Sequence, residues 1–166
     1  MIAVVILNWN GVDMLRRYLP GVVSDCADEG EVIVADNGST DDSLHYLRTE
    51  HPDVRLVCFD QNLGFAGGYN AAFRRIEQET PGRYDYYLLL NSDVRTSPGW
   101  LTPLRTYMDA HPETAAAQPK IHAEWAHDSF EHAGAAGGFI DRFGYPFLFI
   151  SYSIFPLAGI LLFAVL

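Results

Sequence analysis

The sequence predicts an α/β fold with a mainly parallel sheet covered by helices on both faces. Continuous apolar, β-branched runs such as IAVVIL (residues 2–7) lack the polar alternation of a strand with one solvated face, and are typical of strands buried on both sides. Stretches of helical periodicity separate these runs. Strands that alternate with helices form βαβ units, in which neighbouring strands are parallel.

The individual elements follow in chain order. Strands are expected at residues 2–7, 31–35, 54–59, 86–90 and, in the run TAAAQPKI, 114–121. Helices are expected between them at residues 12–24, 41–50 and 68–79. Pro98 is expected in the first turn of a further helix, because proline suits the first helical position. From Ala123 the chain becomes rich in Gly and Ala without a clear period, which predicts a loop or short hairpin.

Composition limits the classes of function. The 166 residues are 49% hydrophobic, enough for one domain with its own core. The net charge of -10 argues against a nucleic-acid partner, although backbone amides or a metal can neutralise a single phosphate ligand locally. Cys26 and Cys58 lack CxxC or zinc-ligand spacing, which favours a reducing compartment. The first strand begins at once, without a signal-peptide pattern, so we expect a cytoplasmic location.

Polar clusters follow the first four expected strands. They are NWNG at residues 8–11, DNGST at 36–40, NLGFAGGYN at 62–70 and NSD at 91–93. The carboxyl ends of parallel strands share one edge of a sheet, where the ligands of such folds bind, so we expect all four clusters on one rim. Each cluster alone has a structural explanation as a turn, a helix cap or a glycine-dependent strand-to-helix connection.

Together the clusters favour a site for a nucleoside diphosphate. Asp36 can accept a hydrogen bond from a ring N–H of a pyrimidine, and Trp9 can offer the base a flat face. Asp93 can hold a divalent cation against a diphosphate, because hard cations take oxygen ligands that include substrate phosphates. No GxGxxG follows the first strand and no Gly-Lys-Ser/Thr occurs, which disfavours a dinucleotide oxidoreductase and a P-loop enzyme.

The segments VVILNWNG, VIVADNGSTDDSLHYL, NLGFAGGYNAAF and LLLNSDV resemble, in order and spacing, the amino-terminal half of family 2 inverting glycosyltransferases, especially rhamnosyltransferase-like members. The resemblance covers about residues 2–147. It implies the Rossmann-like nucleotide-binding half of the A-type glycosyltransferase fold, to which an acceptor-binding region is added. It also implies a UDP- or dTDP-linked sugar as donor, a saccharide or lipid-linked saccharide as acceptor, Mg²⁺ or Mn²⁺ as cofactor, and a role in making cell-envelope polysaccharide.

The resemblance also implies roles for individual residues. Asp36 matches the acid beside the base, Asp93 matches the last acid of an Asp-x-Asp metal motif, and Asn91 stands where many members have the first. The implied nucleotide-binding residues are Asn8, Trp9, Asn10, Asp36, Asn37, Ser39, Asn62, Gly64, Phe65, Ala66, Gly67, Asn70 and Asn91. In the family, the base that deprotonates the acceptor hydroxyl follows well after the metal motif. Glu131 and Asp141 come too early for it and no acid follows, so we expect this base beyond the chain.

The last residues depart from the family pattern. After Arg142 no charged residue remains, and the sequence closes on LFISYSIFPLAGILLFAVL. We expect residues 1–147 to form an incomplete nucleotide-sugar-binding domain, and residues 148–166 to be an abnormal terminus left by truncation. A membrane anchor at the inner face of the cell membrane is the second explanation, because a spanning helix needs about 20 apolar residues. A buried strand or core helix is the third.

Two functions therefore stay open. One is a glycosyltransferase domain that moves a sugar by metal-assisted inverting displacement. The other is a non-catalytic module that binds a nucleotide sugar or recruits a partner. Because the base and most acceptor contacts are missing, we expect residues 1–166 alone to transfer sugar poorly.

Overall fold

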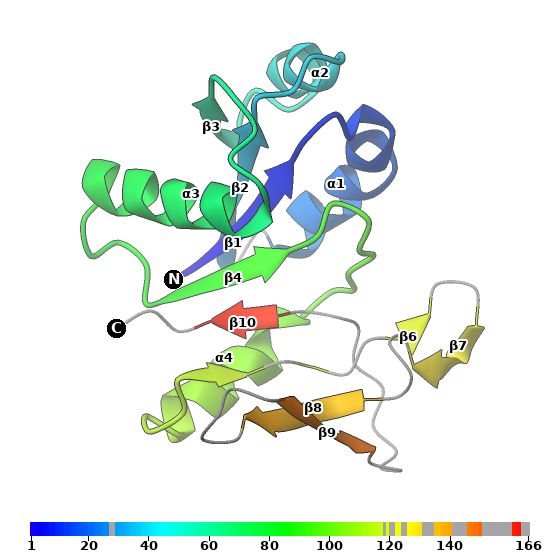
Figure 1. The fold of residues 1–166 in the computed structure, drawn as a ribbon, viewed down its shortest axis with the longest axis vertical. Coiled ribbons are helices and arrows are strands. Elements are labelled where there is room, and N and C mark those ends of the chain that lie inside the picture. The colour runs from blue at the N-terminus through cyan, green and yellow to red at the C-terminus, as the bar shows by residue number, and fades with distance from the viewer. Residues whose placement is uncertain are drawn as a thin grey trace.

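The computed structural model describes residues 1–26, 29–117, 119, 122–123, 126–130, 135–140, 146–150 and 161–163. A six-stranded sheet lies at its centre, in the order β3-β2-β1-β4-β10-β5 (Figure 1). Its first four strands in sequence are β1 (Ile2–Asn8), β2 (Gly30–Asn37), β3 (Arg55–Phe59) and β4 (Tyr86–Leu90). These four pair with one another in parallel, which confirms the predicted, mainly parallel sheet.

Helices cover both faces of this sheet, as the sequence predicts (Figure 1). They are α1 (Val12–Cys26), α2 (Ser43–Glu50), α3 (Phe65–Glu79) and α4 (Leu101–Ala110). Along β1, Ala3 and Val5 belong to the hydrophobic cluster that contains Ile76 of α3. Val4 and Ile6 belong to the opposite cluster, with side chains of α1, α2 and α4. Both sides of the strand are therefore dry, which explains its unbroken apolar sequence.

Three helices begin at other residues than the sequence predicts, and the first of them is α2, which begins at Ser43 instead of residue 41. Helix α3 begins at Phe65 instead of residue 68, and the pair Gly67–Gly68 lies inside its first turn. A Cβ atom on Gly68 would lie 2.8 Å from Cδ1 of Leu7, so glycine there allows close packing of the helix on β1. Helix α4 begins at Leu101, and Pro98 precedes it. Gly99 has a φ of +75°, outside the helical region, and thereby delays the helix.

The later part of the chain contributes short antiparallel pairs. Strand β6 (His122–Ala123) pairs with β7 (Ala126–Phe130), and β8 (Ala135–Ile140) pairs with β9 (Pro146–Ile150). These pairs agree with the short hairpin expected after Ala123. Of the strand expected at residues 114–121, the structure describes β5 (Ala116–Ala117).

Strand β10 (Leu161–Phe163) places three residues of the apolar tail in the central sheet, antiparallel to both β4 and β5. Residues 151–160 and 164–166 lie outside the described part, so the division of the chain at residue 147 stays a prediction. Among the described residues, none of the helices combines the length and the apolar character that crossing a bilayer requires.

The turn after β2 depends on a glycine. Gly38 has a φ of +75°, and a Cβ atom there would lie only 2.6 Å from the backbone carbonyl carbon of Gln61. Glycine is therefore favoured here for two reasons. The backbone is in the left-handed region, and the β2–α2 and β3–α3 connections approach each other closely at this residue.

We expect Gly38→Ala to lower the free energy of unfolding by roughly 1–3 kcal/mol, because alanine adds both backbone strain and a clash with backbone atoms. Urea unfolding followed by circular dichroism measures this change. Gly21→Ala, inside α1 with no atom within 4 Å of the added Cβ, is the matched control and should be neutral or stabilising by about 0.5–1 kcal/mol. Equal effects of the two substitutions would contradict this explanation of Gly38.

Candidate functional site

The carboxyl ends of β1 and β2 are tied together by a buried carboxylate. Asn8 and Asp36 are direct partners in the strand register, and Asp36 is 0% exposed. Its Oδ2 accepts a hydrogen bond from Nδ2 of Asn8 at 3.0 Å, and its Oδ1 accepts one from the backbone N–H of Ser39 at 2.9 Å. A buried carboxylate requires donors of this kind, because it has lost its water. Asp36 therefore holds the two strand ends and the start of the following loop.

A second set of hydrogen bonds joins the loops themselves. The backbone N–H of Asn10 donates to Oγ of Ser39 at 2.9 Å, and Oδ1 of Asn10 accepts from the backbone N–H of Thr40 at 2.7 Å. Asn10 has a φ of 51°, a left-handed conformation that asparagine tolerates better than most residues. The loop after β1 and the loop after β2 therefore fix each other's shape.

Asp41 extends this connection to both following helices. Its two carboxylate oxygens accept hydrogen bonds from the backbone N–H groups of Val12, at the start of α1, and Ser43, at the start of α2. Burial acts to raise the pKa of Asp41, but the hydrogen bonds from Ser43 and Val12 outweigh it, so this pKa lies below its usual value. The carboxylate is thus held in the charged form, which suits the amino-terminal ends of two helices.

Asn37, the last residue of β2, shapes the loop before α3. Its Nδ2 donates to Oδ1 of Asn62 at 3.0 Å and to the carbonyl oxygen of Gly64 at 3.2 Å. Its Oδ1 accepts from the backbone N–H of Leu63 at 2.9 Å. Helix α3 then begins without a side-chain cap, so the N–H groups of its first turn have no side-chain partner there.

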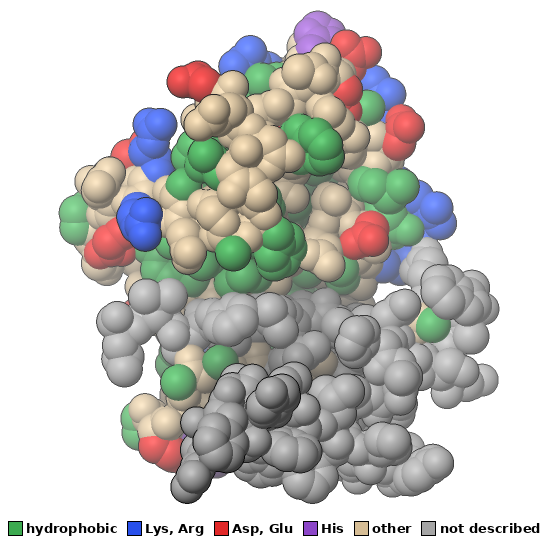
Figure 2. All heavy atoms as spheres, viewed as in Figure 1, with side chains coloured by type: hydrophobic (Ala, Val, Ile, Leu, Met, Phe, Trp, Pro, Cys, Tyr) green, Lys and Arg blue, Asp and Glu red, His purple; other side chains and the backbone are tan. Residues whose placement is uncertain are grey.

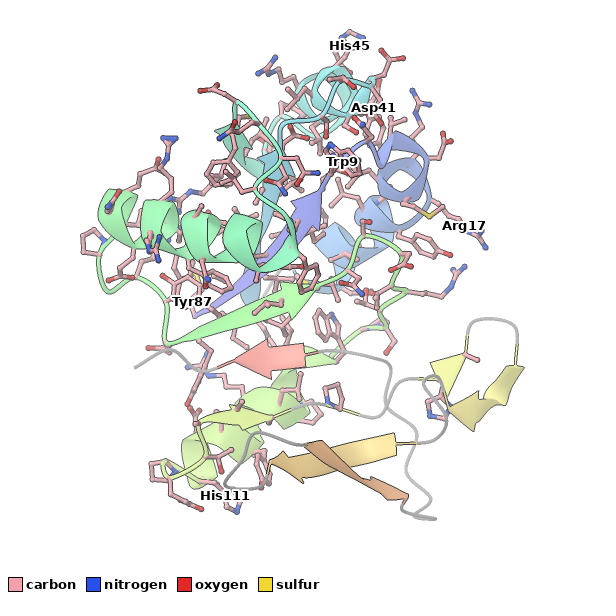
Figure 3. All side chains as sticks on the ribbon, in the orientation of Figure 1. Trp9, Arg17, Asp41, His45, Tyr87 and His111 are labelled. Carbon is pink, nitrogen blue, oxygen red and sulfur yellow. The ribbon has the colours of Figure 1, made fainter. Side chains whose placement is uncertain are left out.

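These elements surround a cleft of about 480 Å³ on the rim. Trp9, at the end of β1 (Figure 3), and Phe65, at the start of α3, line it and are 57% and 63% exposed. Three of the six large hydrophobic side chains exposed in the described part of the chain line this cleft, and Figure 2 shows exposed hydrophobic side chains on this face. An unliganded surface that leaves two aromatic rings in water around a hollow is typical of a ligand site.

The structure brings many of the sequence-predicted residues to this cleft and leaves others outside its lining. The predicted residues that line it are Trp9, Asn37, Asn62, Gly64, Phe65, Asn91 and Asp93. The predicted residues outside the lining are Asn8, Asn10, Asp36, Ser39, Ala66, Gly67 and Asn70. The first four of these support the strand ends and loops, and the last three follow along α3.

Three residues of the lining escape the sequence analysis. Leu7 and Ser92 lie within the segments VVILNWNG and NSD, so their place in these segments could have identified them. Met14 comes from the first turn of α1, and only the packing of that helix brings it to the cleft. Its sequence context carries no corresponding signal.

The oxygen atoms at the end of β4 are suited to a hard cation. Asp93 is exposed in the cleft, and no residue in the described ranges forms an ion pair or hydrogen bond with its carboxylate. Asn91 and Ser92 offer amide and hydroxyl oxygens beside it. Within those same ranges no group of three or more His, Cys, Asp or Glu side chains is placed to hold a metal. A cation here would take its remaining ligands from water and from a bound phosphate, as Mg²⁺ commonly does.

A larger hollow, of about 610 Å³, lies away from the rim between the end of α3 and the start of β4. Tyrosine hydroxyls near it already have partners: Tyr87 donates to Glu77 at 2.8 Å, and Tyr84 donates to Glu31 at 2.8 Å. Desolvation and the hydrogen bond to Glu77 both raise the pKa of Tyr87, which keeps its hydroxyl protonated. The smaller cleft on the rim, where no described residue pairs with the Asp93 carboxylate, is therefore the candidate functional site.

Comparison with known proteins adds independent information. The model of the family described as "Glycosyl transferase family 2" matches residues 3–161. An N-acetylglucosaminyl-diphospho-decaprenol L-rhamnosyltransferase of Mycobacterium tuberculosis is 26% identical over 126 residues, which are 73% of this chain and 41% of that protein. An uncharacterized glycosyltransferase of Nostoc, alr2836, is 33% identical over 75 residues, 43% of this chain and 23% of that protein. The chain thus spans less than half the length of these relatives.

Solved structures share the fold. The mannosyltransferase PcManGT from Pyrobaculum calidifontis, in complex with GDP-Man and Mn²⁺, superimposes with a TM-score of 0.60 at 20% identity, over 74% of this chain and 35% of that one. Residues 1–349 of S. aureus TarS, in complex with UDP-GlcNAc, superimpose with a TM-score of 0.57 at 18% identity, over 74% and 34%. These likenesses confirm the expected Rossmann-like half of the A-type glycosyltransferase fold.

The buried contact between Asn8 and Asp36 can be tested by a double-mutant cycle of Asn8→Ala and Asp36→Ala. We expect a coupling energy of about 1.5–3 kcal/mol, the usual range for a hydrogen bond to a charged group, from urea unfolding of the four proteins. A cycle of Asn8→Ala with Asp109→Ala, an exposed residue of α4, should be additive within about 0.5 kcal/mol. Additivity in the first cycle would contradict the assigned role of Asp36.

Proposed function

The chain belongs to glycosyltransferase family 2, and on that premise we propose that the cleft on the rim binds a nucleoside diphosphate sugar and presents the sugar to a saccharide or lipid-linked saccharide acceptor. The single observation that carries the proposal is the convergence of Trp9, the start of α3 and Asp93 on one cleft at the carboxyl ends of parallel strands. The complexes of PcManGT with GDP-Man and of TarS with UDP-GlcNAc support a donor of this chemical class. The relative from M. tuberculosis, by its name a rhamnosyltransferase acting on a diphospholipid, supports a lipid-linked acceptor.

In this proposal the aromatic side of the cleft receives the base. Trp9 and Phe65 both expose an aromatic ring in the cleft, and a base of any kind can stack on such a ring. Asp36, proposed from the family motif to contact the base, is buried and hydrogen-bonded to Asn8 and Ser39. Its effect on a ligand is therefore exerted through the strand ends that it holds, and a direct contact with the base stays a prediction.

The other side of the cleft receives the diphosphate. The amino-terminal end of α3 directs N–H groups and the positive end of a helix dipole toward anions at Gly64 and Phe65. Asp93, with Asn91 and Ser92, would hold Mg²⁺ or Mn²⁺. A cation bound there neutralises negative charge on the diphosphate and on the departing nucleotide. These contributions make an anionic ligand compatible with a chain of net charge -10.

Inverting displacement also requires a carboxylate that deprotonates the acceptor hydroxyl. Asp128, Glu131 and Asp141 lie outside the side chains that the structure describes, so this role is unassigned. A non-catalytic module that binds the same donor would use the same cleft. Donor binding is therefore the first experiment, and sugar transfer by the longest natural form of the protein is the second.

We expect UDP or dTDP to bind in the presence of Mg²⁺ or Mn²⁺, and at least about tenfold more weakly after chelation, because no described lysine or arginine lines the cleft to replace the cation. Asp93→Ala should remove most of this metal dependence in isothermal titration calorimetry. Asp53→Ala, the same change of charge on an exposed residue before β3, should leave it intact. Equal affinity of the unmodified protein with and without metal would contradict the metal assignment.

The aromatic side of the cleft gives a separate prediction. Trp9→Leu should weaken UDP binding roughly tenfold or more, because stacking of a base on an aromatic ring contributes about 1–3 kcal/mol. Trp9→Phe keeps a flat ring and should retain most of the affinity. If calorimetry finds the leucine and phenylalanine variants equally weak, Trp9 supports the cleft in some way other than stacking.

A further inference from the structure

One buried tyrosine lies behind the cleft, where helix α3 meets the end of strand β4. Tyr69 belongs to the second turn of α3 and is 2% exposed. Its ring meets the ring of Phe65, one turn earlier, edge to face with 5.0 Å between the centroids. Its hydroxyl donates a hydrogen bond to the carbonyl oxygen of Leu90 at 3.1 Å, and Figure 1 shows the start of α3 beside the tip of β4. Tyr69 is not among the residues that line the cleft, so it acts on a ligand only through these neighbours.

The two partners of Tyr69 belong to different sides of the cleft. Phe65 exposes its ring on the aromatic side, and the same helix start is the proposed contact for phosphate. Leu90 is the last residue of β4 and directly precedes residues 91–93, which form the metal side. A single side chain therefore joins the place proposed for the base to the strand end that carries Asp93.

The position of Tyr69 is fixed by close packing. A Cβ atom on the preceding residue, Gly68, would lie 2.8 Å from Cδ1 of Leu7, so the helix rests directly on β1 at this point. Desolvation raises the pKa of Tyr69 to about 12, and a backbone hydrogen bond at Leu7, which acts to lower it, is the smaller effect. The hydroxyl therefore stays protonated near neutral pH and stays a donor to Leu90.

A nucleoside diphosphate would contact both sides of the cleft at once, with its base on one side and its phosphates and cation on the other. The affinity of such a two-part ligand depends on how well the separation of the two sides matches its length. A nucleoside without phosphates occupies one side and lacks this dependence. Any residue that sets the separation should therefore affect the two ligands differently.

We propose that Tyr69 is a positioning residue for the nucleotide sugar, which holds the aromatic side of the cleft and the end of β4 at the separation that a nucleoside diphosphate and its cation require. This inference rests on the proposed function of the cleft. Tyr87 provides a comparison within the same pair of elements. Its hydroxyl also joins β4 to α3, through Glu77 at 2.8 Å, but it does so away from the rim.

The test compares Tyr69→Phe with Tyr87→Phe. Each variant keeps its aromatic ring and loses one hydroxyl between β4 and α3, and circular dichroism checks that both are folded. We expect Tyr69→Phe to bind UDP with Mn²⁺ roughly fivefold more weakly in calorimetry, the change that one neutral hydrogen bond produces. Its affinity for uridine, measured by NMR titration, should be unchanged. Tyr87→Phe should bind both ligands as the unmodified protein does.

Three outcomes would overturn the positioning role. Unchanged UDP affinity in Tyr69→Phe, together with a loss of stability in urea, would leave Tyr69 a purely structural residue. Equal fold-losses for UDP and uridine would indicate local disruption of the cleft and not a change in separation. An equal loss of UDP affinity in Tyr87→Phe would show that any bond between β4 and α3 has the same effect.

The unmodified protein separates failure of this inference from failure of the proposed function. If it binds neither UDP nor uridine, the proposed function is refuted, and the inference with it. If it binds both and Tyr69→Phe leaves the ratio of their affinities unchanged, the inference alone is overturned.

Discussion

The hydrogen bonds of the buried Asp36 carboxylate set the geometry of the whole rim. A charge without access to water must be matched by donors in fixed positions, and here the donors are Asn8 on the neighbouring strand and the backbone of Ser39 in the following loop. Because Ser39 in turn accepts from the backbone of Asn10, the loop after β1 is held as well. The exposed position of Trp9, between Asn8 and Asn10, is a consequence of this network. If the cleft binds the proposed nucleotide sugar, stability and ligand recognition depend on the same carboxylate.

In the proposed function, the cleft also explains how an acidic domain can bind an anionic ligand. The net charge of the chain is -10, and none of the described residues that line the cleft is basic. A cluster of lysines therefore does not provide the positive charge. The fold instead offers the amino-terminal end of α3, where Asn37 fixes the preceding loop, and the Asp93 carboxylate, with which no described residue pairs. In the proposed function, the charge of the ligand is thus balanced within the cleft and not over the whole surface.

Much of the architecture could be predicted from sequence, because strands that are buried on both faces consist of continuous apolar residues. IAVVIL and YYLLL have no polar alternation, and β1 and β4 occupy those positions. The start of α3 was less predictable, since Gly67 and Gly68 have the composition of a turn and only the contact with Leu7 accounts for glycine inside a helix. The site residues were likewise predictable only in part. Motif order predicts that Trp9, Asn37 and Asp93 meet. It cannot tell whether a polar side chain at a strand end faces the cleft or the neighbouring strand, and so it did not predict the buried hydrogen bond between Asp36 and Asn8.

The contact between Gly38 and the backbone of Gln61 has a consequence for the dynamics of ligand entry. Two connections that press backbone against backbone cannot slide past each other, so the segment leading to α3 has little freedom to fold over a bound molecule. We therefore expect the wall of the cleft that this segment forms to have the same shape with and without ligand. Little conformational entropy would then be lost when a ligand binds there. For inhibitor discovery, the shape of this segment without ligand is a template for rigid compounds. Selectivity would then depend on groups of the compound that contact other parts of the cleft.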